Sequence, residues 1–317
     1  MLVVGHVRNE WIFRYTNKKT RQQAKNALQS LDKFIEQKYE NDESLFLAKC
    51  KEPPEDNRYF VLDSLIQWWK MQEYSVPTMH NYFTFIRDYL RRHGIKTHDD
   101  DVKDYIKFPK YIEEEKEPIT KEQIIDILNV SKPKYQCFFL CLASSGMRVG
   151  EFTNAKVSWL NRDFYKKTGN YLIHIPGEFT KGQRDRYTFF SKQASKLLDQ
   201  YVSKRINDGK LLDITYDGAK EYMRYIREKL EMNERYHSGF HKITIHSFRS
   251  YTDTILTDFT NSKFSAMILG HKRGSKINEN EGPGGLRYYR KSPEKALEFY
   301  EKAEPELTIQ YENLYTE

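Results

Sequence analysis

Residues 144–151 read SSGMRVGE, and the fold prediction starts from this stretch. The apolar run 137–143 precedes it and is typical of a buried helix. Gly146 can adopt the left-handed conformation that ends such a helix, and a second helix then begins near Val149. Arg148 therefore lies at the joint between two helices, where a rigid backbone restricts the direction of its side chain. Taken alone, the stretch also fits a surface arginine at an ordinary helix corner.

The composition limits the class of protein. The chain has 317 residues, three cysteines and a net charge of +7. This length predicts two domains, and the basic excess favours nucleic acid over a membrane surface as partner. Three cysteines cannot form the set of disulfides that stabilises a secreted fold, so we expect a reducing compartment. This would be the cytoplasm, with the protein associated with the nucleoid, or the cytoplasm of a host. No apolar run approaches the roughly 18 residues of a membrane span, and residues 1–5 lack the layout of a signal peptide.

The first part of the chain, residues 1–110, predicts a small helical bundle. Apolar residues recur there at helical spacing. The helices are expected at 20–39, about 62–69, 77–93 and 99–108. Residues 2–15 are expected to form a short strand or an arm. Residues 111–118 carry a run of glutamates and end in Pro118, a composition that indicates an exposed linker.

A second domain is expected over residues 119–304. Thr120 and Gln123 have the spacing of a capping box in front of an apolar helix. Apolar segments 171–175 and 187–190 flank a polar link that contains glycine, which predicts a β-hairpin. Helices follow, and residues 305–317 form a tail that either frays or docks on a neighbouring subunit. The predicted fold class is mainly α with a small β-hairpin or sheet (α+β).

Six polar positions of the second domain stand out when they are taken in chain order. They are Arg148, Lys181, His246, Arg249, His271 and a tyrosine at 288 or 289. Each has an ordinary explanation, such as a solvated lysine or a hydrogen-bonded structural histidine. Together they suit one chemical task, the attack on a phosphodiester. Histidines at 237 and 241 also invite a metal interpretation, but no further ligand completes the set.

The chemistry of such a set is coherent. Two arginines can hold one phosphodiester and neutralise the added charge of a five-coordinate transition state. Histidines can bond its oxygens and move a proton near neutral pH. A lysine on a movable hairpin can protonate the leaving sugar oxygen, and cations can favour the phenolate form of a tyrosine nucleophile. The sequence has neither a phosphate-binding GxxxxGK[ST] motif nor carboxylates clustered for magnesium, so we expect no ATP, metal or other cofactor.

Five motifs in order resemble the signature of the tyrosine recombinases of the phage-integrase and Xer type. They are GMRVGE at 146–151, TKG at 180–182, HSFR at 246–249, LGH at 269–271 and RYY at 287–289. The resemblance covers 119 to about 303. The first domain resembles the core-binding bundle of that family only in size and helicity. The segment YEKAEPELTI at 300–309 resembles archaeal and archaeal-virus members.

The resemblance implies a role for each residue. Arg148 and Arg249 would hold the scissile phosphate, and Glu151 would support the arginine pocket. Lys181 would be the general acid, His246 the general base or a phosphate donor, and His271 a donor to a non-bridging oxygen. The tyrosine would form a 3′-phosphotyrosyl link and free a 5′-hydroxyl. Residues 1–110 would then be a DNA-binding core-binding domain.

Two departures from the family pattern leave alternatives open. The stretch between His271 and the tyrosine is long and rich in glycine. It is either a tolerated insertion or a tether that delivers the tyrosine to a neighbouring subunit. The doublet leaves Tyr288 and Tyr289 as candidate nucleophiles. We favour Tyr288 because it gives the following helix the usual family spacing.

The resulting hypothesis is a site-specific DNA recombinase, an integrase of a virus or mobile element. Its partner is double-stranded DNA, on which we expect a homotetramer, with a monomer as the candidate state of the free protein. We expect no membrane partner, and accessory proteins stay open. One alternative is a type IB topoisomerase, which shares the constellation. The other is a non-catalytic DNA-binding protein that kept the fold.

Overall fold

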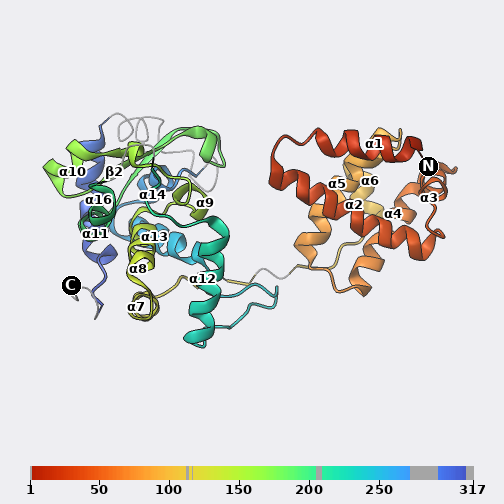
Figure 1. The fold of residues 1–317 in the computed structure, drawn as a ribbon. Helices are drawn as coiled ribbons and strands as arrows, with labels where there is room; N and C mark the ends of the chain where they lie inside the picture. The colour runs from red at the N-terminus through yellow and green to blue at the C-terminus, as the bar shows by residue number, and fades with distance from the viewer. Residues whose placement is uncertain (1, 112–113, 116, 205–208, 272–291, 312–317) are drawn as a thin grey trace. The chain divides into compact units, whose positions relative to one another are not determined.

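The computed structural model describes residues 2–111, 114–115, 117–204, 209–271 and 292–311. The chain divides into two compact units, Met1–Glu114 and Glu115–Glu317, each with its own hydrophobic core (Figure 1). The described elements are mostly helices with one three-stranded antiparallel sheet, which confirms the predicted fold class. In the described parts, none of the helices combines the length and the apolar character that crossing a membrane requires.

The first unit is helical throughout its described elements. Its helices are α1 (Leu2–Phe13), α2 (Lys18–Lys38), α3 (Glu43–Lys51), α4 (Asn57–Met71), α5 (Val76–Arg92) and α6 (Asp99–Tyr105). The expectation of a strand or arm at the start is wrong, because those residues form α1. Trp11 of α1 is buried and donates a hydrogen bond from its indole N–H to Asp88 at 2.8 Å. This contact with α5 is long-range, so local sequence could not reveal it.

Helix α2 forms as its apolar spacing predicts. The side chain of Asn17 accepts hydrogen bonds from the backbone N–H groups of Lys19 and Thr20, which caps the first turn. The inward positions of the predicted stripe are all buried: Ala24, Ala27, Leu28, Leu31, Phe34 and Ile35.

The second unit surrounds a small sheet with helices. Its helices are α7 (Lys121–Asn129), α8 (Pro133–Ser145), α9 (Val149–Phe152), α10 (Arg162–Thr168), α11 (Lys192–Val202), α12 (Tyr216–Lys229), α13 (Ile245–Phe259), α14 (Ser262–Leu269) and α16 (Pro293–Leu307), with 3₁₀ turns η1 (Val157–Trp159) and η2 (Gly177–Phe179). Strands β1 (Leu160–Asn161), β2 (Leu172–Ile175) and β3 (Arg186–Phe189) pair in that order. Residue 172 opposes 189, so the predicted hairpin is confirmed. β1, which the sequence did not predict, adds to its edge.

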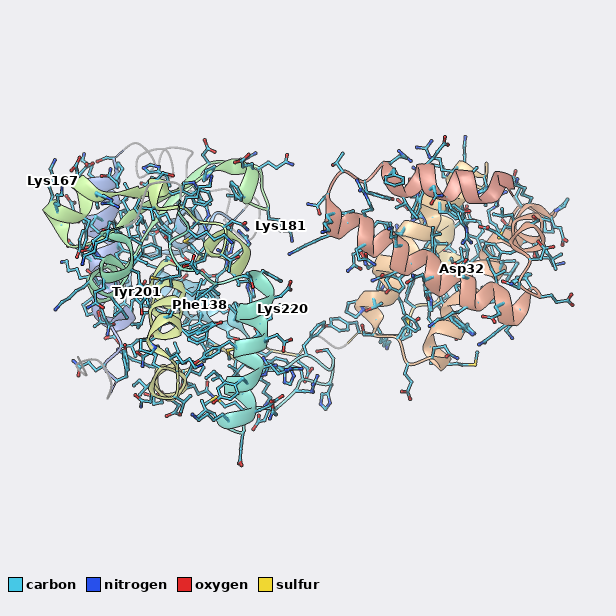
Figure 2. The ribbon with its side chains drawn as sticks, viewed as in Figure 1. Asp32, Phe138, Lys167, Lys181, Tyr201 and Lys220 are labelled. Atoms are coloured by element: carbon cyan, nitrogen blue, oxygen red, sulfur yellow. The ribbon has the colours of Figure 1, made fainter. Side chains whose placement is uncertain are left out.

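Helix α8 is the buried centre of this unit, as its apolar run predicts. It packs against α11 and α13, and Figure 2 shows its Phe138 among the side chains of the unit's interior. The rings of Phe139 and Phe248 stack with centroids 5.0 Å apart, which joins α8 to α13. The hydroxyl of Tyr300 on α16 donates to the carbonyl of Ser144 at 2.9 Å. Helix α8 is thereby held by α13 in its middle and by α16 at its end.

Gly146 ends α8 in the left-handed conformation, as predicted, with φ 60°. The corner also passes very close to α14. A Cβ added at Gly146 would lie 2.2 Å from Cδ2 of Leu269, whose side chain is fully buried. Glycine is therefore required here both by backbone conformation and by the close approach of the two helix ends.

Replacement of Gly146 by alanine is expected to destabilise the protein strongly. The left-handed backbone and the clash with Leu269 together predict a loss of about 2–5 kcal/mol in the free energy of unfolding. Gly94 is the matched control, since it has φ +78° but nothing within 4 Å of an added Cβ. Gly94→Ala should cost only about 1–2 kcal/mol. Urea denaturation measures both, and equal losses would contradict the close approach.

Residues 308–311, which follow α16, pack against their own chain. Ile309 is buried, and its backbone N–H donates to the side chain of Gln193 on α11 at 2.9 Å. Gln193 in turn donates to the carbonyl of Ile309. Of the expected tail at 305–317, residues 305–307 belong to α16 and residues 308–311 pack against α11, so its described part is ordered on its own chain instead of frayed.

Candidate active site

Arg148 is fixed by Glu151 at the start of α9. The backbone N–H of Arg148 donates to Oε2 of Glu151 at 2.8 Å, and its Nη1 donates to Oε1 at 2.9 Å. The side chain of Glu151 is 1% exposed and that of Arg148 is 29% exposed. Glu151 therefore holds both the backbone and the guanidinium of Arg148 at the joint that the sequence predicts, and part of the Arg148 side chain stays accessible.

Arg186 is a second cation on the same carboxylate. Its Nη2 lies 2.6 Å from Oε2 of Glu151, and its Nη1 donates to the carbonyl of Ile268 at the end of α14. Burial opposes ionisation of Glu151, but the charges of Arg186 and Arg148 outweigh it and lower its pKa below the usual 4.5. Glu151 is thus a buried carboxylate that stays ionised at neutral pH.

Arg249 is the third arginine of the cluster and the most confined. It lies on α13 with 4% of its surface exposed. Nη1 donates to the carbonyl of Gly146 at 2.5 Å, and Nη2 donates to that of Leu269 at 2.6 Å. Burial, followed by the charges of Arg148 and Arg186, lowers its pKa to about 9. Arg148 and Arg186 therefore contact one carboxylate directly, and Arg249 lies close enough to feel their charges. The surplus positive charge suits an anion.

His271 follows directly on the end of α14. Gly270 ends that helix with φ +69°, and the backbone N–H of His271 donates to the carbonyl of Ala266 at 2.9 Å. Desolvation of the imidazole, and then the charge of Arg249, lowers the pKa of His271 below 6.5. The residue is nevertheless exposed at the surface of the unit.

The lowered pKa of His271 predicts a neutral imidazole at pH 7. Removing a nearby cation should raise that pKa, so Arg148→Gln is expected to move the titration of His271 upward towards 6.5. NMR titration of labelled histidine rings, with the His271 signal identified by its loss in His271→Asn, measures both values. A wild-type pKa at or above 6.5 would contradict the charge arrangement.

The other predicted positions lie at the surface or outside the described residues. Lys181 is exposed in the turn between η2 and β3, as Figure 2 shows. Thr180 braces that turn, because its Oγ1 accepts from the N–H of Arg184 at 3.1 Å. His246 is exposed in the first turn of α13, the helix that carries Arg249. Tyr288 and Tyr289 lie outside the described residues.

The structure therefore unites some of the predicted residues and not others. A hydrogen bond joins Arg148 to Glu151. Arg249 and His271 lie close enough that, in addition to desolvation, the charge of Arg148 lowers the pKa of both. His246 lines a cavity of about 570 Å³ together with Ser250 and Asp253 on the same helix. Among the described residues, no group of three His, Cys, Asp or Glu side chains is arranged to hold a metal ion.

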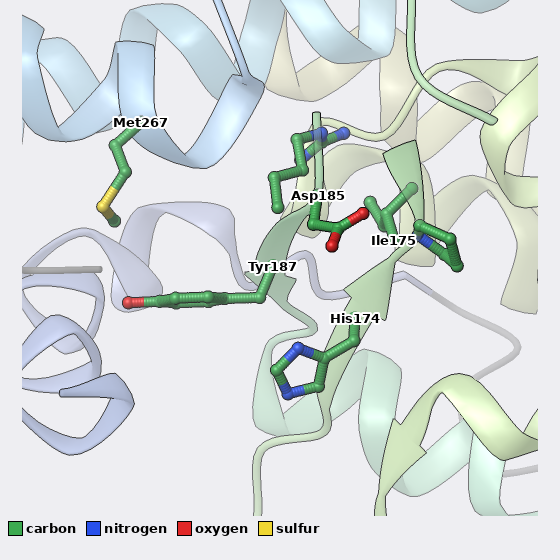
Figure 3. Close-up of a pocket in the computed structure, with 7 residues that line it drawn as sticks. His174, Ile175, Asp185, Tyr187 and Met267 are labelled. Carbon is green, nitrogen blue, oxygen red and sulfur yellow. The ribbon is translucent and has the colours of Figure 1, made fainter. Parts of the chain in front are cut away.

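Arg186 is a site residue that its sequence context does not reveal, because it closes the polar link between the two predicted strands. The residue opens β3, pairs with Ile175 of β2 and is 8% exposed at its side chain. It also borders a cavity of about 380 Å³ between the hairpin and α14, lined by His174, Tyr187 and Met267 among others (Figure 3). No local signal pointed to it, because Arg186 is buried by tertiary contacts with Glu151 and Ile268 and not by a pattern within β3.

The helical unit and the arginine-rich catalytic unit define a class of DNA-processing protein. Residues 117–279 match the phage integrase family, and the chain belongs to that family. The match spans α7 to α14 and includes all the described residues of the arginine cluster.

Relatives support the same placement. The chain is 28% identical over 236 residues to the tyrosine recombinase XerC of Leptospira interrogans serogroup Icterohaemorrhagiae serovar copenhageni, covering 70% of this chain and 69% of that protein. It is 31% identical over 83 residues, 25% of each chain, to the XerC of Lactobacillus delbrueckii subsp. bulgaricus.

Solved structures share the fold at low sequence identity. A lambda integrase tetramer bound to a Holliday junction aligns with a TM-score of 0.60 and 13% identity, over 88% of this chain and 80% of that one. The Tn1549 transposon integrase with transposon right end DNA gives 0.57 and 14%, over 84% and 90%.

Proposed function

We propose that this protein is a site-specific DNA recombinase that cuts and rejoins DNA strands through a covalent tyrosine link. One observation carries the proposal: Arg148 and Arg249 lie in one cluster whose positive charge exceeds the single buried carboxylate that it surrounds. A phosphodiester supplies the missing negative charge. The relatives named tyrosine recombinase XerC support the same reaction.

In the proposed reaction, Arg148 and Arg249 hold the non-bridging oxygens of the scissile phosphate. His271 and His246 donate to the same phosphate, and His246 accepts a proton during attack. The phenol oxygen of Tyr288 forms a bond to phosphorus while the bond to the 5′ oxygen breaks, and Lys181 donates a proton to that oxygen. The 3′-phosphotyrosyl ester keeps the bond energy, so the 5′-hydroxyl of another strand can reverse the step without ATP or metal.

The assembly and the biological role are finer parts of the proposal. Exchange joins two duplexes, so we propose a tetramer assembled on DNA, in keeping with the tetramer seen for lambda integrase. We also propose that the protein serves a virus or mobile element of archaeal type, which residues 300–309 favour by resemblance. Mixing Arg249→Ala with Tyr288→Phe protein tests subunit sharing, because recovered activity requires the tyrosine of one subunit to act in another.

A nicked suicide substrate that carries the recombination site tests the reaction. Wild-type protein should form a covalent protein–DNA adduct with EDTA present and ATP absent. Arg148→Ala should slow adduct formation about 10²–10³-fold, the usual cost of losing one preorganised donor to the transition state. Absence of any adduct would favour the non-catalytic alternative. Relaxation of supercoiled plasmids that lack the site would indicate a topoisomerase.

A further inference from the structure

Arg186 joins two parts of the proposed active site that are far apart in sequence. On one side its Nη2 lies 2.6 Å from Glu151, and Glu151 holds Arg148. On the other side its Nη1 donates to the carbonyl of Ile268, three residues before His271 in the chain. Its Nε is buried without a hydrogen-bond partner in the described part of the chain. The side chain is therefore committed to these two anchors and is not available as a surface contact.

The first anchor decides what Arg148 can do. Oε1 of Glu151 accepts from the guanidinium of Arg148, and Oε2 accepts from the backbone N–H of Arg148 and from Arg186. If Arg186 were absent, Glu151 would have Arg148 as its one direct partner, and the pair would be close to neutral. With Arg186 present, one cation balances Glu151 and the charge of Arg148 is left for a phosphate.

The second anchor fixes the end of α14. Arg186 and Arg249 take the adjacent carbonyls of Ile268 and Leu269, which lack partners within the helix. The chain then turns at Gly270, where an added Cβ would lie 2.5 Å from Cδ of Arg186. The direction in which the chain leaves α14 towards His271 therefore depends on the packed side chain of Arg186.

We propose that Arg186 is a positioning residue for DNA cleavage, which sets Arg148 through Glu151 and His271 through the carboxyl end of α14. The inference rests on the proposed recombinase function and adds a residue to its machinery. Because Arg186 acts through Arg148 and His271 in this proposal, its effect should show in the rate of the chemical step and its pH dependence. DNA affinity should stay nearly constant.

The test compares Arg186→Gln and Arg186→Lys with Arg162→Gln in the full-length protein. Arg162 is the matched control, because it also donates to helix-end carbonyls, at 3.0 Å to that of Val202, from α10 and not from the hairpin that carries Arg186. At saturating nicked DNA, Arg186→Gln should form adduct about 10²-fold more slowly, the cost of an ångström-scale misplacement. Arg186→Lys keeps the charge but not both anchors, so it should recover part of that rate.

The pH profile separates positioning from general loss of structure. Without the charge of Arg186 the pKa of Glu151 rises. The rate of Arg186→Gln should therefore fall at a higher pH on the acid side than that of wild type, whereas Arg162→Gln keeps the wild-type profile. Adduct formation by Arg186→Gln within about 3-fold of wild type, with an unshifted profile, would overturn the proposal. If Arg186→Gln does not fold, wild-type rate and profile in Arg186→Lys would overturn it.

A second readout needs no catalysis. The side-chain Nε–H signal of Arg148 in ¹⁵N NMR, identified by its loss in Arg148→Lys, should shift or broaden in both Arg186 variants and stay unchanged in Arg162→Gln. An unchanged signal in the Arg186 variants would overturn the positioning role even if wild type cleaves DNA. Absence of adduct in wild type would instead overturn the recombinase proposal, while the signal still decides whether Arg186 holds Arg148.

Discussion

Tyr288→Phe is expected to abolish the covalent adduct on nicked DNA, a loss of at least about 10³-fold, because the substitution removes only the oxygen that attacks phosphorus. DNA binding should be unchanged, since the ring and the neighbouring basic residues remain. Time courses of adduct formation under saturating protein, followed on denaturing gels, measure the rate.

Tyr289→Phe is the matched control for this prediction. It removes one phenol oxygen from the adjacent residue of the doublet and should leave the rate within about 3-fold of wild type. The reverse result, with adduct formed by Tyr288→Phe and none by Tyr289→Phe, would move the nucleophile by one residue. Adduct formed by both single variants but not by the double variant would show that either tyrosine can attack.

The second large effect is expected at Arg249. Arg249→Ala should slow adduct formation about 10²–10³-fold, because a preorganised cation is lost from the transition state. It should also lower the free energy of unfolding by about 1–3 kcal/mol for each carbonyl left unsatisfied, those of Gly146 and Leu269. Single-turnover cleavage and urea denaturation measure the two losses separately.

Arg249→Lys distinguishes the two roles of the guanidinium. A lysine keeps the charge but lacks the planar set of N–H donors that lets a guanidinium bond two carbonyls and a phosphate at once. Both the cleavage rate and the free energy of unfolding should therefore be restored only in part. Cleavage by Arg249→Ala at a rate within about 3-fold of wild type would contradict a phosphate-binding role, whatever its stability.

The fold was predictable where local pattern and burial agree. The apolar run before Gly146 forms a buried helix, and Thr120 and Gln123 form a capping box, both as expected. In these cases a few neighbouring residues determine the conformation, so the local sequence is sufficient to predict it. The start of the chain failed because Trp11 packs on α5, a partner 77 residues away.

The candidate site was predictable by residue type but not by contact. Arg148, Glu151 and Arg249 could be singled out because their chemistry suits a phosphate, and the structure places them in one cluster. Arg186 was missed because its place in the cluster depends on tertiary contacts with Glu151 and Ile268. A polar residue in a link gives no local sign that its side chain turns inward.

The covalent adduct itself provides the most direct test of the central claim. Trypsin cuts after Arg287 and Arg290, which releases the segment Tyr288-Tyr289-Arg290 with its attached nucleotide for tandem mass spectrometry. We expect a 3′-phosphate of the cleaved strand esterified to the oxygen of Tyr288, with a free 5′-hydroxyl on the other fragment. A 5′-phosphate link, or attachment at a residue outside this segment, would contradict it.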